Sequence, residues 1–296
     1  MALNRLHFII YFFCISLLGC DNQSNPPEEN DILGNTINEL VSDAETYLTL
    51  SADSSVWFAQ QAWHLSKDIK NDQTVKSLYV LSRALYNKGE LYQALKYLIQ
   101  AHDIAVKLSL QTIIPDLLNL QGNIYGSMGQ YDKAVEFYLE ALNLYHAFND
   151  KQNEGKVFNN LGLVYYRMDQ IEKSLDYHRK AYHIWDSLDY RQGLGSSYTN
   201  LSYVYTKWNE YDTALDYLNH ALDIYRDMGN LRREANTYIN FGWVYMNIGE
   251  YEKALDYFNR SLPMSQKGGF MDIYTDGLNK KGWALNKLNR QEEALQ

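Results

Sequence analysis

The chain repeats a pattern of small and aromatic residues at a fixed interval. Gly122 and Gly162 stand 40 residues apart, Gly242 and Gly282 continue the series, and serines fill its missing places. Four of these positions are followed three residues later by a tyrosine, and each tyrosine is followed by alanine or serine nine and sixteen residues further on. A period of this length predicts a solenoid, in which each unit packs mainly on its neighbours.

Each period is predicted to hold two amphipathic helices. Small side chains recur where two helices cross at close range, because a larger group would overpack the contact at a cost of about 1 to 3 kcal/mol. Residue types that accept a left-handed backbone occupy one column between the paired helices and predict a helix end there: Gly89, Gly129, Asp169, Asn209, Gly249 and Asn289. A second column of turn formers leads to the next unit: Asn149, Asp189, Gly229 and Gly269.

These columns resemble the signature of the tetratricopeptide repeat (TPR). The shorter repeat of that family has about 34 residues and a proline near the end of its second helix. Both features are missing here, and the 40-residue unit resembles the extended TPR variety of peptide-binding scaffolds and bacterial regulators. The resemblance implies an all-α fold, an α-solenoid of tandem helix-turn-helix repeats wound as a right-handed superhelix.

The array is predicted to occupy residues 32–296 as about six repeats. The first repeat is degenerate, and its second helix is expected around residues 54–69. The last repeat is expected to be truncated, since residues 290–296 resemble the start of the helix at 251–257 and the chain then stops. Pro263 falls inside a helix, so a kink or an early end is expected there.

The first 31 residues predict export and a membrane tether. Residues 6–18 are apolar apart from His7 and Ser16, but about 13 residues are fewer than the roughly 20 that span a membrane. Residues 17–20, Leu-Leu-Gly-Cys, resemble the bacterial lipobox. This resemblance implies that residues 1–19 are a signal peptide that is removed and that Cys20 is lipidated by acyl chains such as palmitate. An ordinary signal peptide with an incidental cysteine is the alternative.

Residues 20–31 contain two prolines and several acidic residues after Cys20 and no large apolar residue, so they are predicted to be a disordered tether. Each acyl chain adds about 0.8 kcal/mol per buried methylene, so a lipidated Cys20 would hold the protein on the membrane. The expected location is the bacterial cell envelope, at the inner or outer membrane, with the array facing the periplasm or the exterior.

Charge and motifs exclude several function classes. The formal net charge is −9, which offers no broad positive field for nucleic acid. No HExxH, CxxC, GxSxG or phosphate-cradling glycine loop occurs in the sequence, and its two cysteines, Cys14 and Cys20, form no disulfide framework. His178 occupies a column of packed rings. The chain is therefore predicted not to be an enzyme and to need no cofactor or metal.

A candidate binding surface follows from the helical periodicity. At about 100° per residue, Leu161 and Gly162 share one side of their helix, while Asn160 and Leu163 lie on the opposite side. In TPR folds the first helices of successive repeats line the concave surface, and the resemblance places these residues in that groove: Asn160, Asn200, Asn240, Leu163, Tyr203, Trp243, Arg167 and Lys207.

The asparagine ladder has two interpretations. A side-chain amide both donates and accepts, so a row of amides could bind the main chain of an extended peptide of any sequence. Alternatively, the asparagines bond to the neighbouring helix and keep the stack in register. Arg83, Arg167 and Lys207 would add positive charge to the inner surface and favour an acidic peptide or a carboxyl terminus.

Two functions fit these patterns. The first is a lipid-anchored scaffold or adaptor that binds a protein or peptide in the groove, similar to TPR lipoproteins that organise envelope machinery. The second is the sensory part of a longer signalling regulator, with a histidine kinase or DNA-binding effector beyond residue 296. Exposed end helices could also let arrays stack into homo-oligomers.

Overall fold

The computed structural model describes residues 29–48, 50–290 and 293, and within them the chain is entirely helical, without β-strands. The signal peptide, Cys20 and most of the predicted tether lie outside these residues. Thirteen helices follow one another in the described part: α2 Glu29–Tyr47, α3 Ala52–Ser66, α4 Asp72–Lys88, α5 Leu91–Lys107, α6 Ile114–Ser127, α7 Tyr131–Ala147, α8 Lys151–Arg167, α9 Ile171–Ser187, α10 Arg191–Lys207, α11 Tyr211–Asp227, α12 Leu231–Ile248, α13 Tyr251–Gly268 and α14 Met271–Lys287.

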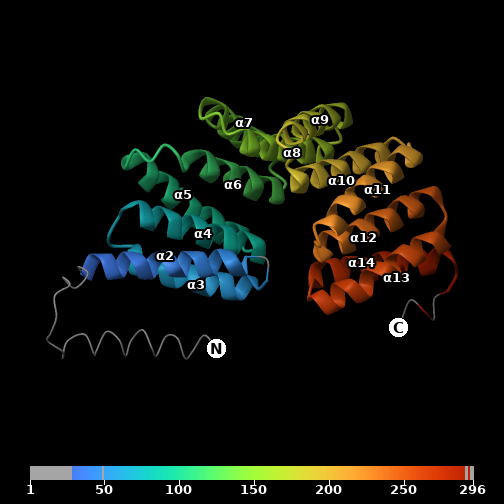
Figure 1. Cartoon of the computed structure of the whole chain (residues 1–296), viewed down its shortest axis with the longest axis horizontal. Helices are drawn as coiled ribbons and strands as arrows, with labels where there is room; N and C mark the ends of the chain where they lie inside the picture. The colour runs from blue at the N-terminus through green and yellow to red at the C-terminus, as the bar shows by residue number, and fades with distance from the viewer. Residues whose placement is uncertain (1–28, 49, 291–292, 294–296) are drawn as a thin grey trace.

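The helices are arranged as antiparallel pairs stacked in a row. Each even-numbered helix from α2 to α12 packs against the odd-numbered helix that follows it, and α14 packs on α13. The even-numbered helices also contact one another in sequence, from α2 and α4 to α12 and α14. Figure 1 shows the stack bent into an arch, with α4, α6, α8, α10 and α12 towards its inner side. The expected all-α solenoid is therefore confirmed.

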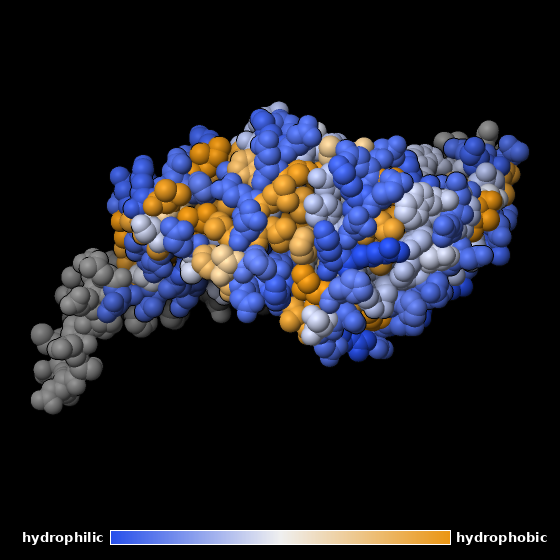
Figure 2. Space-filling model, turned by 90° about the horizontal axis from the view of Figure 1, so that it is seen from above, coloured by the Kyte–Doolittle hydropathy of each residue, from blue (hydrophilic) through white to orange (hydrophobic). Residues whose placement is uncertain are grey.

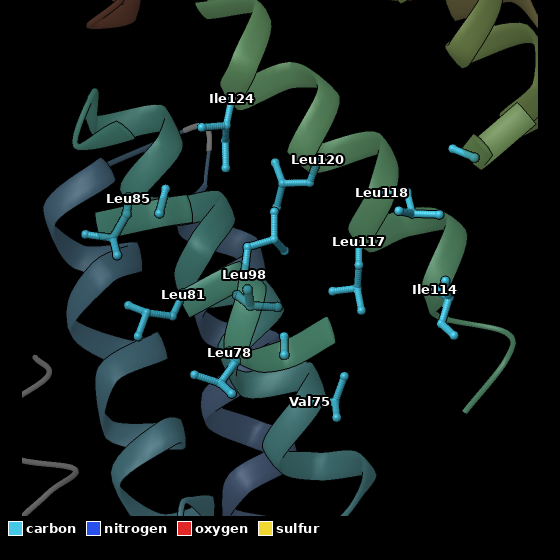
Figure 3. Packing of buried hydrophobic residues seen from close by; sticks show 14 of the residues in the cluster. Val75, Leu78, Leu81, Leu85, Leu98, Ile114, Leu117, Leu118, Leu120 and Ile124 are labelled. Atoms are coloured by element: carbon cyan, nitrogen blue, oxygen red, sulfur yellow. The ribbon is translucent and has the colours of Figure 1, made fainter. Parts of the chain in front are cut away.

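The hydrophobic core runs along the stack between helix layers. Its first and largest part joins residues from Ala44 to Val164, and smaller clusters continue the core to Leu285. Leu98 of α5 lies between Leu81 of α4 and Leu117 of α6, and all three side chains are fully buried (Figure 3). A second helix thus fills the space between two successive first helices, which binds each pair to the next.

The turns have the backbone conformation that their sequence predicts. Both columns of turn residues have positive φ angles, from +49° at Asp189 to +90° at Gly249. The chain reverses after each left-handed residue, and the amide that follows bonds to a carbonyl in the last turn of the helix, as Gln130 does with Tyr125 at 2.9 Å. These stops fix where each helix ends.

The small-residue column marks close helix contacts. A β-carbon on Gly122 would lie 2.5 Å from the ring of Tyr138 in α7, and one on Gly242 would lie 2.3 Å from the ring of Phe258 in α13. The tyrosines of the same pattern stack on an aromatic ring of the paired helix, with ring centroids 5.2 to 5.4 Å apart: Tyr125 with Phe137, Tyr165 with Tyr177, Tyr205 with Tyr217, and Tyr245 with Tyr257.

Pro263 does not end its helix early, so that expectation is wrong. Helix α13 continues past Pro263 to Gly268. Proline removes a helix hydrogen bond at a cost of about 3 kcal/mol, but packing around it favours the helix. The hydroxyl of Ser261 donates to the carbonyl of Ala235 in α12 at 2.8 Å, and Leu262 and Ser265 are buried. Contacts to α12 therefore hold both sides of the proline in place.

Candidate peptide-binding surface

The predicted groove residues lie on α8, α10 and α12, the first helices of three successive pairs. These helices contact one another and lie towards the inner side of the arch (Figure 1). Leu163, Tyr203 and Trp243 are each half-buried, while the cationic residues Arg167 and Lys207 are exposed. The arrangement combines apolar and polar side chains on neighbouring helices.

Two ladder asparagines bond to the preceding first helix. The Nδ2 group of Asn160 donates to Oδ1 of Asn119 at 3.0 Å and to Oδ1 of Asn123 at 3.1 Å, both on α6. The Nδ2 group of Asn200 donates to Oδ1 of Asn159 on α8 at 2.6 Å. These bonds link one repeat to the next, as the register interpretation of the ladder requires. Sequence reasoning missed the partner asparagines Asn119, Asn123 and Asn159.

The third ladder residue has a free donor. Oδ1 of Asn240 accepts a hydrogen bond from the hydroxyl of Tyr203 at 3.2 Å, whereas Nδ2 of Asn240 is buried and has no partner among the described residues. Burial raises the pKa of the Tyr203 hydroxyl to about 12, so this hydroxyl stays protonated and can donate at physiological pH. An unpaired buried donor costs about 1 to 3 kcal/mol, which an acceptor from a bound molecule would recover.

An exposed tryptophan extends the surface onto α14. Trp283 is 56% exposed, and its ring centroid lies 6.4 Å from that of Trp243. Nζ of Lys280 lies 5.9 Å from the centroid of Trp243 and also pairs with Asp276. Sequence reasoning missed Trp283 and Lys280, although they follow Trp243 and Asn240 by one 40-residue step.

The positive charges of the surface differ in their partners. Lys207 pairs with Asp169 at 3.1 Å and Arg83 with Glu45 at 3.2 Å, while Arg167 donates to the carbonyl of Gly126 at 3.5 Å. Exposed pairs of this kind contribute at most about 1 kcal/mol to stability. A competing carboxylate could therefore replace Asp169 or Glu45 at little cost.

A cavity of about 150 Å³ opens between α8 and α10 beside the ladder. Its lining includes Lys156, Asn160 and Ser196 from the two helices, together with the rings of Trp185 and Tyr190. Gly193 also lines it, and a β-carbon there would lie 2.3 Å from the Trp185 ring. Sequence reasoning placed Lys156 and Ser196 on the inner surface but gave no sign of the cavity or of the two rings.

His178 lies away from this surface, buried against Gly162. A β-carbon on Gly162 would lie 2.5 Å from the imidazole, and Nδ1 of His178 has no hydrogen-bond partner among the described residues. Burial lowers the pKa of His178 to about 3, so the ring is neutral at physiological pH. In the described part of the chain, no cluster of three or more His, Cys, Asp or Glu side chains is placed to hold a metal ion.

Stacked helix pairs with a shared inner surface define the class of helical repeat proteins. Models of the tetratricopeptide repeat match residues 73–147, 153–227 and 235–267, which together make up more than half of the chain. The chain therefore belongs to the tetratricopeptide repeat family. No curated protein gives a significant match to it by sequence.

Solved structures share this fold at low sequence identity. BtubC (BKLC) from P. vanneervenii has a TM-score of 0.56 and 21% identity, over 79% of this chain and 91% of that chain. A Rap protein complexed with Competence and Sporulation Factor has a TM-score of 0.65 and 17% identity, over 91% and 74%. A STAND signal transduction ATPase with a tetratricopeptide repeat sensor, from Pyrococcus horikoshii, has a TM-score of 0.64 and 16% identity, over 90% and 43%. These likenesses show the fold alone.

Among the described residues, none of the helices combines the length and apolar character needed to cross a membrane.

Proposed function

We propose that the chain is a non-catalytic scaffold that binds a peptide or a protein segment along α8, α10 and α12. The observation that carries the proposal is the buried Nδ2 group of Asn240, which lacks an acceptor beside Tyr203 and the exposed ring of Trp283. An extended peptide supplies a carbonyl at every residue and side chains for the apolar contacts. The Rap protein of similar fold, complexed with Competence and Sporulation Factor, supports a partner of this kind.

The ladder asparagines have two roles in this proposal. Asn160 and Asn200 bond to the preceding helix through Nδ2, and a carboxamide oxygen accepts through two lone pairs, so their oxygens are proposed to face the ligand. Asn240 is proposed to donate instead. The ladder would thus keep the stack in register and also bind the main chain.

Selection from a displayed library of random ten-residue peptides tests the proposal. Changing Asn160, Asn200 and Asn240 to alanine should abolish capture of the selected peptides by the full chain in detergent. The control variant changes Asn143, Asn219 and Asn259 to alanine, because these exposed asparagines lie on α7, α11 and α13. Circular dichroism at the binding temperature establishes that both variants are folded. If the ladder variant is folded and captures peptides as the control does, the surface is assigned wrongly.

We also propose that the repeat unit is the extended 40-residue type. The second helices α7, α9, α11 and α13 begin at Tyr131, Ile171, Tyr211 and Tyr251. These starts support one constant step.

The membrane anchor is a separate proposal. Cys20 in the Leu-Leu-Gly-Cys segment is proposed to carry acyl chains after residues 1–19 are removed, which would restrict the scaffold to the surface of one membrane of the envelope. Intact mass of the native protein extracted with detergent tests this. A mass that begins at Cys20 plus acyl chains supports the anchor, and a Cys20→Ser variant should then appear in the soluble fraction. An unmodified N-terminal Cys20 would remove the anchor from the proposal.

A sensory module within a longer regulator is the second candidate function. The observation that favours it is the likeness to the STAND ATPase, of which this chain matches 43%, in a protein described as having a repeat sensor. The same intact mass decides between the two candidates. A product much larger than the 34.5 kDa of this chain supports the sensory module. A product close to the mass of this chain supports the scaffold.

A further inference from the structure

The cavity between α8 and α10 is formed by features that occur together in one repeat. Trp185 at the end of α9 is 3% exposed, and glycines stand on both neighbouring first helices where the ring packs. A β-carbon would lie 2.4 Å from its Nε1 atom if placed on Gly155 and 2.3 Å from its Cδ2 atom if placed on Gly193. The positions one repeat away from Gly193 hold Asn153 and Arg233. The missing side chain at Gly193 thus admits the indole and leaves space beside it.

The cavity has the size of a side-chain pocket. Its volume of about 150 Å³ is well above the roughly 10 to 15 Å³ that hold one water molecule. The rings of Trp185 and Tyr190 are arranged edge to face, with centroids 6.1 Å apart, and provide an apolar wall. Asn160 of the ladder also lines the cavity, so a peptide bound to the ladder would place a side chain at its opening.

The polar part of the lining carries one positive charge and no negative charge. Lys156 is exposed at the cavity, and its Nζ atom donates to Oδ1 of Asn153 at 2.8 Å. Among the described residues it pairs with no carboxylate, although the whole chain has a net charge of −9. The other polar groups at the cavity are amides of Asn160 and Gln192 and the hydroxyl of Ser196. This set favours a negatively charged group that accepts hydrogen bonds.

We propose that this cavity is a specificity subsite for one acidic side chain, aspartate or glutamate, of the peptide that binds along the ladder. The proposal rests on the proposed function, because it needs a peptide on the inner surface. The carboxylate lies within reach of Lys156 and the amides, and the methylene groups contact Trp185 and Tyr190. The subsite makes the scaffold selective for sequence, whereas the asparagine ladder binds the main chain of any peptide.

Two variants of the full chain separate charge from space. Lys156→Glu reverses the only charge of the lining and should change the preferred peptide residue from acidic to basic. Ser196→Phe fills the cavity from a half-buried helix position whose hydroxyl bonds only to the carbonyl of Gln192 in its own helix, at 3.1 Å. The matched control is Asn236→Phe, at the same place one repeat further on and outside the cavity. It adds the same bulk without filling the cavity.

The assay is selection of each variant, in detergent, against the displayed library of random ten-residue peptides, followed by sequencing of the captured peptides. The parent chain and Asn236→Phe should enrich an acidic residue at one peptide position, and replacing that residue by its amide should weaken binding about tenfold. Ser196→Phe should lose this preference and Lys156→Glu should reverse it. Captured peptides without an acidic preference, or an unchanged preference in both variants, overturn the subsite alone. Capture of no peptide by the folded parent chain overturns the proposed function and the subsite together.

Discussion

Acid should destabilise the array through His178. The ring is buried opposite Gly162, and its burial lowers its pKa to about 3 from the ordinary value of 6.5. Between these values the unfolded chain binds a proton that the folded chain excludes, so the unfolded state gains stability as the pH falls. The stabilisation from a neutral His178 is complete above pH 6.5 and decreases as the pH is lowered towards 3.

The size of the effect follows from the pKa difference. Each pH unit below 6.5 costs about 1.4 kcal/mol of unfolding free energy. Lowering the pH from 7.5 to 5.0 therefore removes about 2 kcal/mol through this residue. Aspartate and glutamate have ordinary pKa values near 4, so most exposed carboxylates remain ionised at pH 5.0. For a chain of this size, the loss lowers Tm by roughly 4 to 8 °C.

The variant His178→Phe isolates this contribution. Phe258 occupies the same place opposite Gly242 in a later repeat, so a phenyl ring fits the position. Thermal unfolding followed by circular dichroism at pH 7.5 and 5.0 should show a smaller loss of Tm in this variant than in the parent chain. His220→Gln, at a histidine whose side chain is 54% exposed, is the control and should lose as much as the parent. An equal loss of Tm in all three proteins would refute the reasoning.

Two further predictions concern glycines with different environments. Gly242→Ala should lower the unfolding free energy by about 1 to 3 kcal/mol, since its β-carbon would lie 2.3 Å from Phe258; Gly282→Ala, with no atom within 4 Å of the new β-carbon, should leave Tm unchanged or raise it. Equal effects of the two alanines would contradict the overpacking. Gly249, at φ +90°, should tolerate asparagine better than valine by about 1 kcal/mol in urea unfolding, because asparagine is the commoner left-handed residue. The opposite order would show that backbone strain does not control that turn.

Local patterns in the sequence were sufficient for the turns and the close helix contacts. Each turn needs a residue that accepts positive φ, and each close crossing needs a missing side chain, so glycine and asparagine mark both in the sequence. Pro263 was misjudged because its cost depends on the packing around it. Ser261 anchors α13 to α12 on one side of the proline, and no local pattern contains that contact.

The candidate site was only partly predictable. Periodicity placed Asn160, Asn200 and Asn240 on one helix face, but it could not show that two of them bond to a neighbouring helix while Nδ2 of Asn240 stays unpaired. Trp283 could have been found, since it repeats the position of Trp243 after 40 residues. It was missed because attention was restricted to three complete repeats.

The sequence by itself determined the repeat, the helix ends and the inner helix face, because these depend on residue type and spacing within one unit. Surfaces between units were decided by tertiary structure. Figure 2 shows apolar residues gathered on the side of the outer surface nearer the N-terminus, a distribution that follows from how successive pairs are stacked. The cavity beside Trp185 likewise exists because Gly155 and Gly193, from different repeats, approach one ring. Such a space depends on distances between helices far apart in the chain, which residue spacing does not encode.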